Sequence, residues 1–268
     1  MIQNRVNPVP TKISDKNRKS VIQGALTTVA LLFLAPKQIS AMHIAEGLLP
    51  AAWAIGWYIL ALPFLIVGVR MISTRVKEDR RILPLLGLVG AVVFLISIFP
   101  IPVPVAGTSS HPCGTPLGAI LLGPFISTVL GAIALLFQAL FLSHGGLSTL
   151  GANIISMAVV GSFVGFGVFW LTRRFGASLF LAAFAAGIIG DWATYTMTSL
   201  ELASGLSVGN FGELWRTLII GYAPTQLPLG VIEGLFTAAV VVAIAQRRPE
   251  LLSNFFAPKK TAFQGATP

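Results

Sequence analysis

Hydrophobic residues along this chain fall in long runs, and polar residues gather in the short stretches between them. A helix that spans a bilayer needs about 20 mainly apolar residues. Runs near that length recur through the sequence, at residues 51–69, 82–99, 117–142, 152–171, 177–199 and 225–245. The pattern predicts an all-α polytopic membrane protein, because lipid leaves backbone polar groups no partner outside a helix.

The stretches between the runs differ in character. Residues 70–81 are rich in Arg and Lys, as is typical of a cytoplasmic loop. Residues 106–116 and 143–151 are rich in small and turn-forming residues, which predicts irregular loops. Residues 200–222 are expected to form a longer loop.

The run at 117–142 is long enough for one tilted span or for two short ones. Charge favours two, because cytoplasmic loops carry the excess of Lys and Arg. With two crossings, every basic residue after Met42 except Arg216 lies on the cytoplasmic side. We therefore predict about seven spans, with a helical pair turning near 127–131, the mature N-terminus outside and a cytoplasmic tail at 249–268.

The first 41 residues have the pattern of a secretory signal. A basic stretch precedes an apolar run at 21–35, which is short for a span, and the segment ends at the small residue Ala41. Cleavage there would leave a mature transmembrane domain at 42–248. The alternative is an anchor helix that is not removed.

Composition supports a membrane location and narrows the function. Hydrophobic residues make up 55% of the chain and charged residues 10%, with a mean hydropathy of +0.84. The net charge of +9 falls to about +4 without the predicted signal, and topology accounts for that remainder, so nucleic-acid binding is not indicated. The single cysteine, Cys113, excludes an internal disulfide and a thiolate metal cluster. The sequence contains no Gly-rich phosphate loop ending in Lys-Ser or Lys-Thr.

Cleavage after Ala41 would create a metal chelator. The free amine of Met42, the backbone nitrogen of His43 and the imidazole Nδ1 of His43 can close two fused rings on one ion. Nitrogen ligands in a square plane suit Ni(II) and Cu(II), and low-spin Co(II) accepts the same set. Without cleavage, His43 is only a histidine between helices.

The chain has only three histidines, His43, His111 and His144, and the predicted topology puts all of them on the outer side. His111 lies in a turn-rich segment, which favours a role as a ligand. His144 either neutralises the C-terminus of the preceding helix or lies beside the metal without binding it.

Acids within or near apolar runs need partners and are therefore candidates for the site. Asp191 and Glu233 are such acids, and Glu46 closely follows His43. They either orient ligand histidines through the second ring nitrogen or bond helix ends and backbone amides. Asn153 is expected to cap a helix, and the alternative is an amide that lines the site.

Five motifs occur in order along the chain. They begin at Met42, His111, Leu121, His144 and Glu233, and read Met-His-Ile-Ala-Glu-Gly-Leu-Leu-Pro, His-Pro-Cys-Gly-Thr, Leu-Leu-Gly-Pro, His-Gly-Gly-Leu-Ser-Thr-Leu-Gly-Ala-Asn and Glu-Gly. Together they resemble the CbiM/NikM family, the substrate-binding S-components of energy-coupling factor transporters for cobalt and nickel. Because many members start directly at Met-His, the long leader is a departure from the family.

The resemblance implies a six-helix core with one added N-terminal helix, and a metal site formed by Met42, His43 and His111. It implies that Co(II) or Ni(II) is a transported substrate, with no cofactor and no enzymatic activity. The expected partners are a coupling transmembrane protein, two ATP-binding-cassette ATPase subunits and a small accessory membrane subunit. The expected location is the plasma membrane, which is the inner membrane in a Gram-negative cell.

Cobalt, for cobalamin synthesis, is expected ahead of nickel because a long extra C-terminal segment is absent. Two other classes stay open. A metal-dependent intramembrane enzyme could use His43, His111 and His144, although the sequence has no His-Glu-x-x-His pattern. An S-component for a vitamin fits the architecture but leaves the Met-His start unexplained.

Overall fold

The computed structural model of the chain describes residues 43–98, 101–103, 108–249 and 251–252. They belong to the second of two units into which the chain divides, Ile39–Pro268. The predicted signal, Met42 and most of the predicted tail lie outside the described residues. The described helices are α2 (Ala51–Glu78), α3 (Ile82–Ser97), α4 (Thr115–Leu122), α5 (Pro124–Phe141), α6 (Leu150–Asn153), the π-helix η1 (Ile154–Val160), α7 (Gly161–Arg174), α8 (Leu179–Leu206) and α9 (Phe211–Arg247).

The predicted class, a helical membrane protein, is confirmed. Five helical stretches in the described residues are long and apolar enough to cross a membrane: Ala51–Glu78, Pro124–Phe141, Leu150–Arg174, Leu179–Leu206 and Phe211–Arg247. Helix α3 is apolar but shorter, and α4 has 8 residues, so the count of about seven spans stays a prediction. Strands β1 (Ile101–Val103) and β2 (Thr108–Ser110) add a short antiparallel hairpin that the sequence pattern did not predict.

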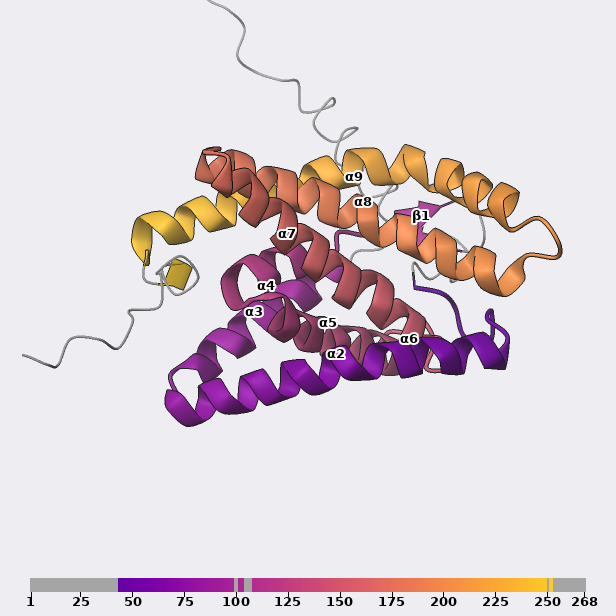
Figure 1. Cartoon of the computed structure of the whole chain (residues 1–268), viewed down its shortest axis with the longest axis horizontal. Helices are drawn as coiled ribbons and strands as arrows, with labels where there is room; N and C mark the ends of the chain where they lie inside the picture. The colour runs from indigo at the N-terminus through magenta and orange to yellow at the C-terminus, as the bar shows by residue number, and fades with distance from the viewer. Residues whose placement is uncertain (1–42, 99–100, 104–107, 250, 253–268) are drawn as a thin grey trace, which may run out of the picture. The chain divides into compact units, whose positions relative to one another are not determined.

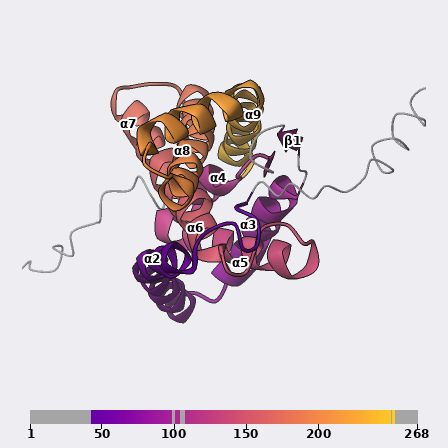
Figure 2. The ribbon, with the colours of Figure 1, turned by 90° about the vertical axis from the view of Figure 1, so that its right-hand side faces the viewer.

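Within this unit α8 and α9 run side by side along one edge, α2 lies along the opposite edge, and α4, α5 and α7 lie between them (Figure 1). The view turned by 90° has α2 and α5 on one side of α4 and α6, and α8 and α9 on the other (Figure 2). Every residue of α4 is buried. This short central helix is therefore enclosed by the long ones.

The predicted helical pair at 117–142 is confirmed as α4 and α5, but the predicted position of the turn is wrong. The break lies at Gly123, ahead of the predicted 127–131. Gly123 has a φ of 92°, which favours glycine, and Pro124 suits the first position of the next helix because it needs no N–H partner there. The pair returns the chain to the side from which it entered, since the His111 and His144 rings meet.

Two predicted loops are largely helical. Helix α2 has 28 residues and runs on to Glu78, because a helix can continue beyond the bilayer with charged residues in its last turns. The predicted loop at 200–222 shrinks to the few residues between Leu206 and Phe211. Pro224 and Pro228 both lie inside α9, as packing against neighbouring helices permits in membrane proteins.

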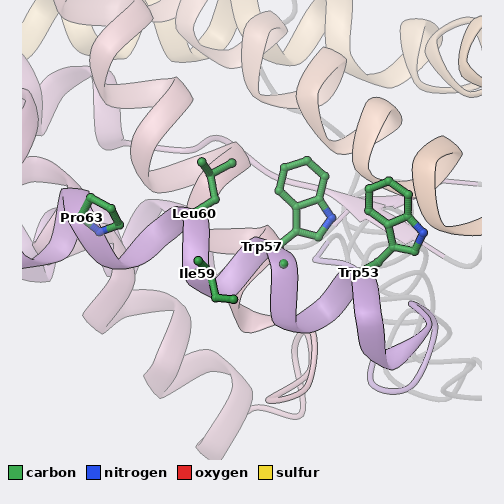
Figure 3. Close-up of a pocket in the computed structure, with 6 residues that line it drawn as sticks. Trp53, Trp57, Ile59, Leu60 and Pro63 are labelled. Atoms are coloured by element: carbon green, nitrogen blue, oxygen red, sulfur yellow. The ribbon is translucent and has the colours of Figure 1, made fainter.

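The outer surface of α2 suits contact with lipid. Trp53 and Trp57, near its start, stack with ring centroids 6.3 Å apart (Figure 3). With Ile59, Leu60 and Pro63 they line an open groove of about 550 Å³, whose walls are almost entirely apolar. The position of the tryptophans at one end of the helix agrees with an aromatic belt at a membrane surface.

The close packing of α8 on α9 can be tested at Gly187. A Cβ there would lie 2.7 Å from the Gly234 Cα, so Gly187→Ala must push the helices apart. We expect it to destabilise the protein by about 1–3 kcal/mol, seen as a lower midpoint of thermal unfolding in detergent. Gly167→Ala in α7 is the control, because no described atom lies within 4 Å of the added methyl group. Equal losses in both variants would contradict the packing argument.

Candidate metal centre

The residues just ahead of α2 enter the protein as irregular chain and leave His43 only 4% exposed. The Ile44 N–H donates to Asn153 Oδ1 at 2.8 Å, and the Thr149 hydroxyl donates to the Ile44 carbonyl. Side chains thus satisfy backbone groups that no helix pairs. The prediction that Asn153 caps a helix is wrong: its own backbone is helical, its side chain makes no capping bond, and its amide instead holds the segment that carries His43.

Glycines after His144 let this segment lie directly on the loop. A Cβ on Gly145, whose φ is 85°, would lie 2.8 Å from the His43 Cβ, and one on Gly146 would lie 2.5 Å from the Glu46 Cα. The Glu46 carboxylate accepts the Ser148 N–H at 3.0 Å, and hydrogen bonds from Ser148 lower the pKa of that carboxyl group. Glu46 therefore fastens the segment to the loop, which is the amide-binding role left open by the sequence.

Helices α8 and α9 hold the loop that carries His111. The His111 N–H donates to the Tyr195 hydroxyl at 3.2 Å, and that hydroxyl donates to the His111 carbonyl at 3.0 Å. The amides of Cys113 and Gly114 donate to the two carboxylate oxygens of Glu233, at 2.6 and 2.8 Å. Glu233 thus bonds backbone amides, the second of its two predicted roles, and acts on His111 through the loop.

The three histidines converge in one buried group. The His43 ring centroid lies 5.0 Å from that of His111 and 4.9 Å from that of His144, and the last two lie 5.3 Å apart. One nitrogen from each ring lies within 4.8 Å of the others. The exposed fractions are 4%, 0% and 8% for His43, His111 and His144. Such a group could hold one metal ion.

A chain of hydrogen bonds orients His43. The Ser97 hydroxyl donates to the Val93 carbonyl at 2.8 Å, so its oxygen accepts the Gln138 amide N–H at 2.6 Å. The Gln138 carbonyl oxygen then faces His43 and accepts its Nε2–H at 2.8 Å. The proton on Nε2 leaves Nδ1 of His43 with a free lone pair. Sequence reasoning missed Gln138, although a lone amide within the apolar run at 117–142 was a signal.

His111 is oriented in the opposite sense. Its Nδ1–H donates to the Pro112 carbonyl at 2.9 Å, which leaves Nε2 as the nitrogen without a proton. That atom accepts a second, longer hydrogen bond from the His43 Nε2–H, at 3.3 Å. The two rings therefore present different nitrogens for coordination, Nδ1 from His43 and Nε2 from His111.

Burial keeps the three rings neutral. It lowers the pKa of His43 to about 3, with a further contribution from the nearby His144 ring, and the pKa of His144 to about 4. The pKa of His111 also lies well below its usual value, first because of burial and then because of His43. Since neutral imidazole is the form that binds metals, all three rings are in that form at neutral pH.

A second buried group follows His111 in the loop. Cys113 donates its thiol proton to Asp191 Oδ1 at 3.7 Å, and ligand atoms of these two residues and Glu233 lie within 4.8 Å of one another. Burial raises the pKa of the Cys113 thiol, which keeps it protonated. Asp191 thus lies against Cys113 and Glu233. Among the described residues, it makes no hydrogen bond to any of the three imidazoles. Glu201, placed by the sequence in a loop, is also fully buried in α8.

The fold and the buried imidazoles define a polytopic membrane protein with a candidate transition-metal site, and solved structures share the fold. A crystal structure titled as that of a transition metal transporter matches with a TM-score of 0.70 and 27% identity, covering 80% of this chain and 97% of that one. A truncated transition metal transporter matches with a TM-score of 0.68 and 28% identity, over 76% and 99% of the two chains.

Residues 43–251 match the family described as CbiM, the cobalt uptake substrate-specific transmembrane region. The chain belongs to the CbiM family, which confirms the resemblance read from the motifs. It is 52% identical over 232 residues to the cobalt transport protein CbiM of Geobacter sulfurreducens, spanning 86% of this chain but only 66% of that longer protein. It is 48% identical over 214 residues to that of Sorangium cellulosum, spanning 80% and 95%.

The seating of the His43 segment can be tested at Gly146. A methyl group there meets the backbone of Glu46, so Gly146→Ala should lift residues 43–49 from the loop. We expect faster amide hydrogen exchange at Ile44, whose N–H now donates to Asn153. Gly56→Ala in α2 is the control, since no described atom lies within 4 Å of its added methyl. Unchanged protection of Ile44 in the Gly146 variant would contradict the seating.

Proposed function

We propose that this protein is the substrate-capture subunit, or S-component, of an ATP-driven energy-coupling factor importer for a divalent transition metal. The observation that carries the proposal is the pair His43 and His111, which are buried and neutral and each keep one ring nitrogen without a proton, Nδ1 in His43 and Nε2 in His111.

The proposed ligands are the amine of Met42, the backbone nitrogen and Nδ1 of His43, and Nε2 of His111. An amine, the next backbone nitrogen and Nδ1 of the next imidazole form fused rings on one metal only if Nδ1 carries no proton. Gln138 supports this arrangement because it holds the proton of His43 on Nε2. On metal binding, Nε2 of His111 would exchange its contact with His43 for the metal. Four nitrogens in a plane suit Co(II) and Ni(II).

The remaining predicted site residues do not bind the metal in this proposal, but they hold the two segments that carry its ligands. Asn153 and Glu46 hold the segment that carries His43, and Glu233 holds the loop that carries His111. Residues that orient metal ligands typically change metal affinity about 10- to 100-fold when they are lost. Asp191 supports the same loop through Cys113.

In this proposal the metal is transported unchanged, and the protein is not an enzyme. The leader is removed after Ala41, the new N-terminus lies on the outer side of the plasma membrane, and the tail lies in the cytoplasm. A coupling transmembrane protein, two ATP-binding-cassette ATPases and a small accessory membrane subunit would drive release inward. The return of α5 to the side where α4 begins supports a site open to one face only.

Cobalt is proposed ahead of nickel, and cobalamin synthesis would be its use. The family is described by cobalt uptake, and the relatives from Geobacter sulfurreducens and Sorangium cellulosum are named as cobalt transport proteins. The planar nitrogen set alone would accept either metal.

The decisive test is N-terminal sequencing of the protein purified from membranes, combined with its metal content by native mass spectrometry. We expect a start at Met42 and one cobalt or nickel ion per chain. His43→Ala and His111→Ala should both lose tight binding, because each removes a ligand. Acetylation of the Met42 amine should also abolish it, since an acetylated nitrogen no longer binds the metal. Metal binding that survives acetylation of this amine would refute the amine ligand.

The orienting role of Gln138 gives a separate prediction. Gln138→Leu removes the closer acceptor for the His43 Nε2–H, so the ring can protonate on Nδ1 instead. We expect cobalt affinity to fall by about 10- to 100-fold in equilibrium titrations. Ser97→Ala is the control, because it removes the support of the amide but leaves the acceptor and should have the smaller effect. Equal affinity in the wild type and in Gln138→Leu would show that the amide does not select the tautomer.

A further inference from the structure

His144 is buried among the other two rings without a use in the planar site. Its side chain is 8% exposed, and its Nε2 has no hydrogen-bond partner among the described residues. At the C-terminus of the preceding helix it is the backbone of His144, not its side chain, that makes the contact: the His144 N–H donates to the Gln138 carbonyl at 3.1 Å. A buried polar atom without a partner destabilises a protein, so the ring nitrogen needs another explanation.

The orientation of the His144 ring suggests one. In the proposed chelate the fused rings lie nearly in the plane of the His43 imidazole, so that plane is the coordination plane. An imidazole that binds the metal from above must stand nearly perpendicular to it, because its own plane contains the metal–nitrogen bond. The His144 ring satisfies this condition, at 80° to the His43 ring with centroids 4.9 Å apart. The His111 ring, at 72°, satisfies it as well, so the buried Nε2 of His144 without a partner is what distinguishes this ring.

We propose that His144 binds the metal through Nε2 from above the plane, as a fifth ligand, and that this ligand makes the site prefer Co(II) to Ni(II). The inference rests on the proposed function, because it needs the planar nitrogen set of Met42, His43 and His111. It adds the residue that would discriminate between the two metals which the plane alone accepts.

The preference follows from the electrons that point along the axis. Low-spin Co(II) in a square plane holds one unpaired electron in the orbital directed above and below the plane, and a fifth nitrogen donor stabilises this arrangement. Low-spin Ni(II) has that orbital filled and repels a fifth donor, which is why it favours square-planar geometry. An imidazole held at the axial position by burial therefore favours cobalt.

Electron paramagnetic resonance of the mature protein, which starts at Met42, tests the axial nitrogen directly. The protein in detergent is loaded with CoCl2, with oxygen excluded, and frozen. We expect a low-spin Co(II) spectrum in which each cobalt line along the axis is split into a triplet by one nitrogen nucleus. His144→Ala should lose the triplet while keeping a low-spin signal, and added imidazole should restore it.

Equilibrium titrations with CoCl2 and NiCl2 test the preference. We expect His144→Ala to weaken cobalt binding by at least about 10-fold, because loss of a residue that only orients a ligand already weakens metal binding by that much. Nickel affinity should change little in His144→Ala, and the retained nickel site also shows that the variant is folded. Equal losses for the two metals would overturn the proposed preference.

The two levels of the proposal fail differently. A wild-type protein that binds cobalt without the nitrogen triplet would overturn the role of His144 and leave the planar site standing. A wild-type protein that starts at Met42 but binds neither metal would overturn the planar site itself, and the fifth ligand with it. The wild-type spectrum decides the axial nitrogen even if His144→Ala does not fold.

Discussion

The structure depends on satisfying backbone polar groups where the chain is not helical. Within a helical membrane protein, an irregular segment is tolerated only if its N–H and C=O groups find partners in the protein. The segment with His43 pairs with Asn153, and the loop with His111 pairs with Tyr195 and Glu233. The same bonds that make these segments tolerable also set the positions of their imidazoles.

Burial then determines the chemistry of the group. Removal from water keeps the rings neutral and makes the few remaining hydrogen bonds decisive for where each proton lies. Gln138 holds the proton of His43 on one nitrogen, and the Pro112 carbonyl holds that of His111 on the other. Gly145 contributes by allowing the His43 segment to approach closely enough to exclude water. Orientation and dehydration together prepare the group for the proposed metal.

The arrangement of helices explains why residues far apart in sequence share one site. The pair α4 and α5 turns at Gly123, so the loops before and after it lie at the same end. Helices α8 and α9 pack closely and contribute the side chains that hold the His111 loop. Membership of the CbiM family is consistent with this division between a rigid helical frame and two inserted segments.

The sequence by itself determined the helical membrane class, the family and the choice of the three histidines as candidate site residues. Apolar run length, charge bias and contiguous motifs are local signals that can be read without the fold. It misplaced the turn at Gly123 and the helical extent of 200–222, since turn position and tolerance of proline depend on neighbouring helices. It also misjudged Asn153 and missed Gln138. Only the tertiary structure decided which ring nitrogen of His43 is free, because a hydrogen-bond partner 95 residues away holds the proton on the other nitrogen.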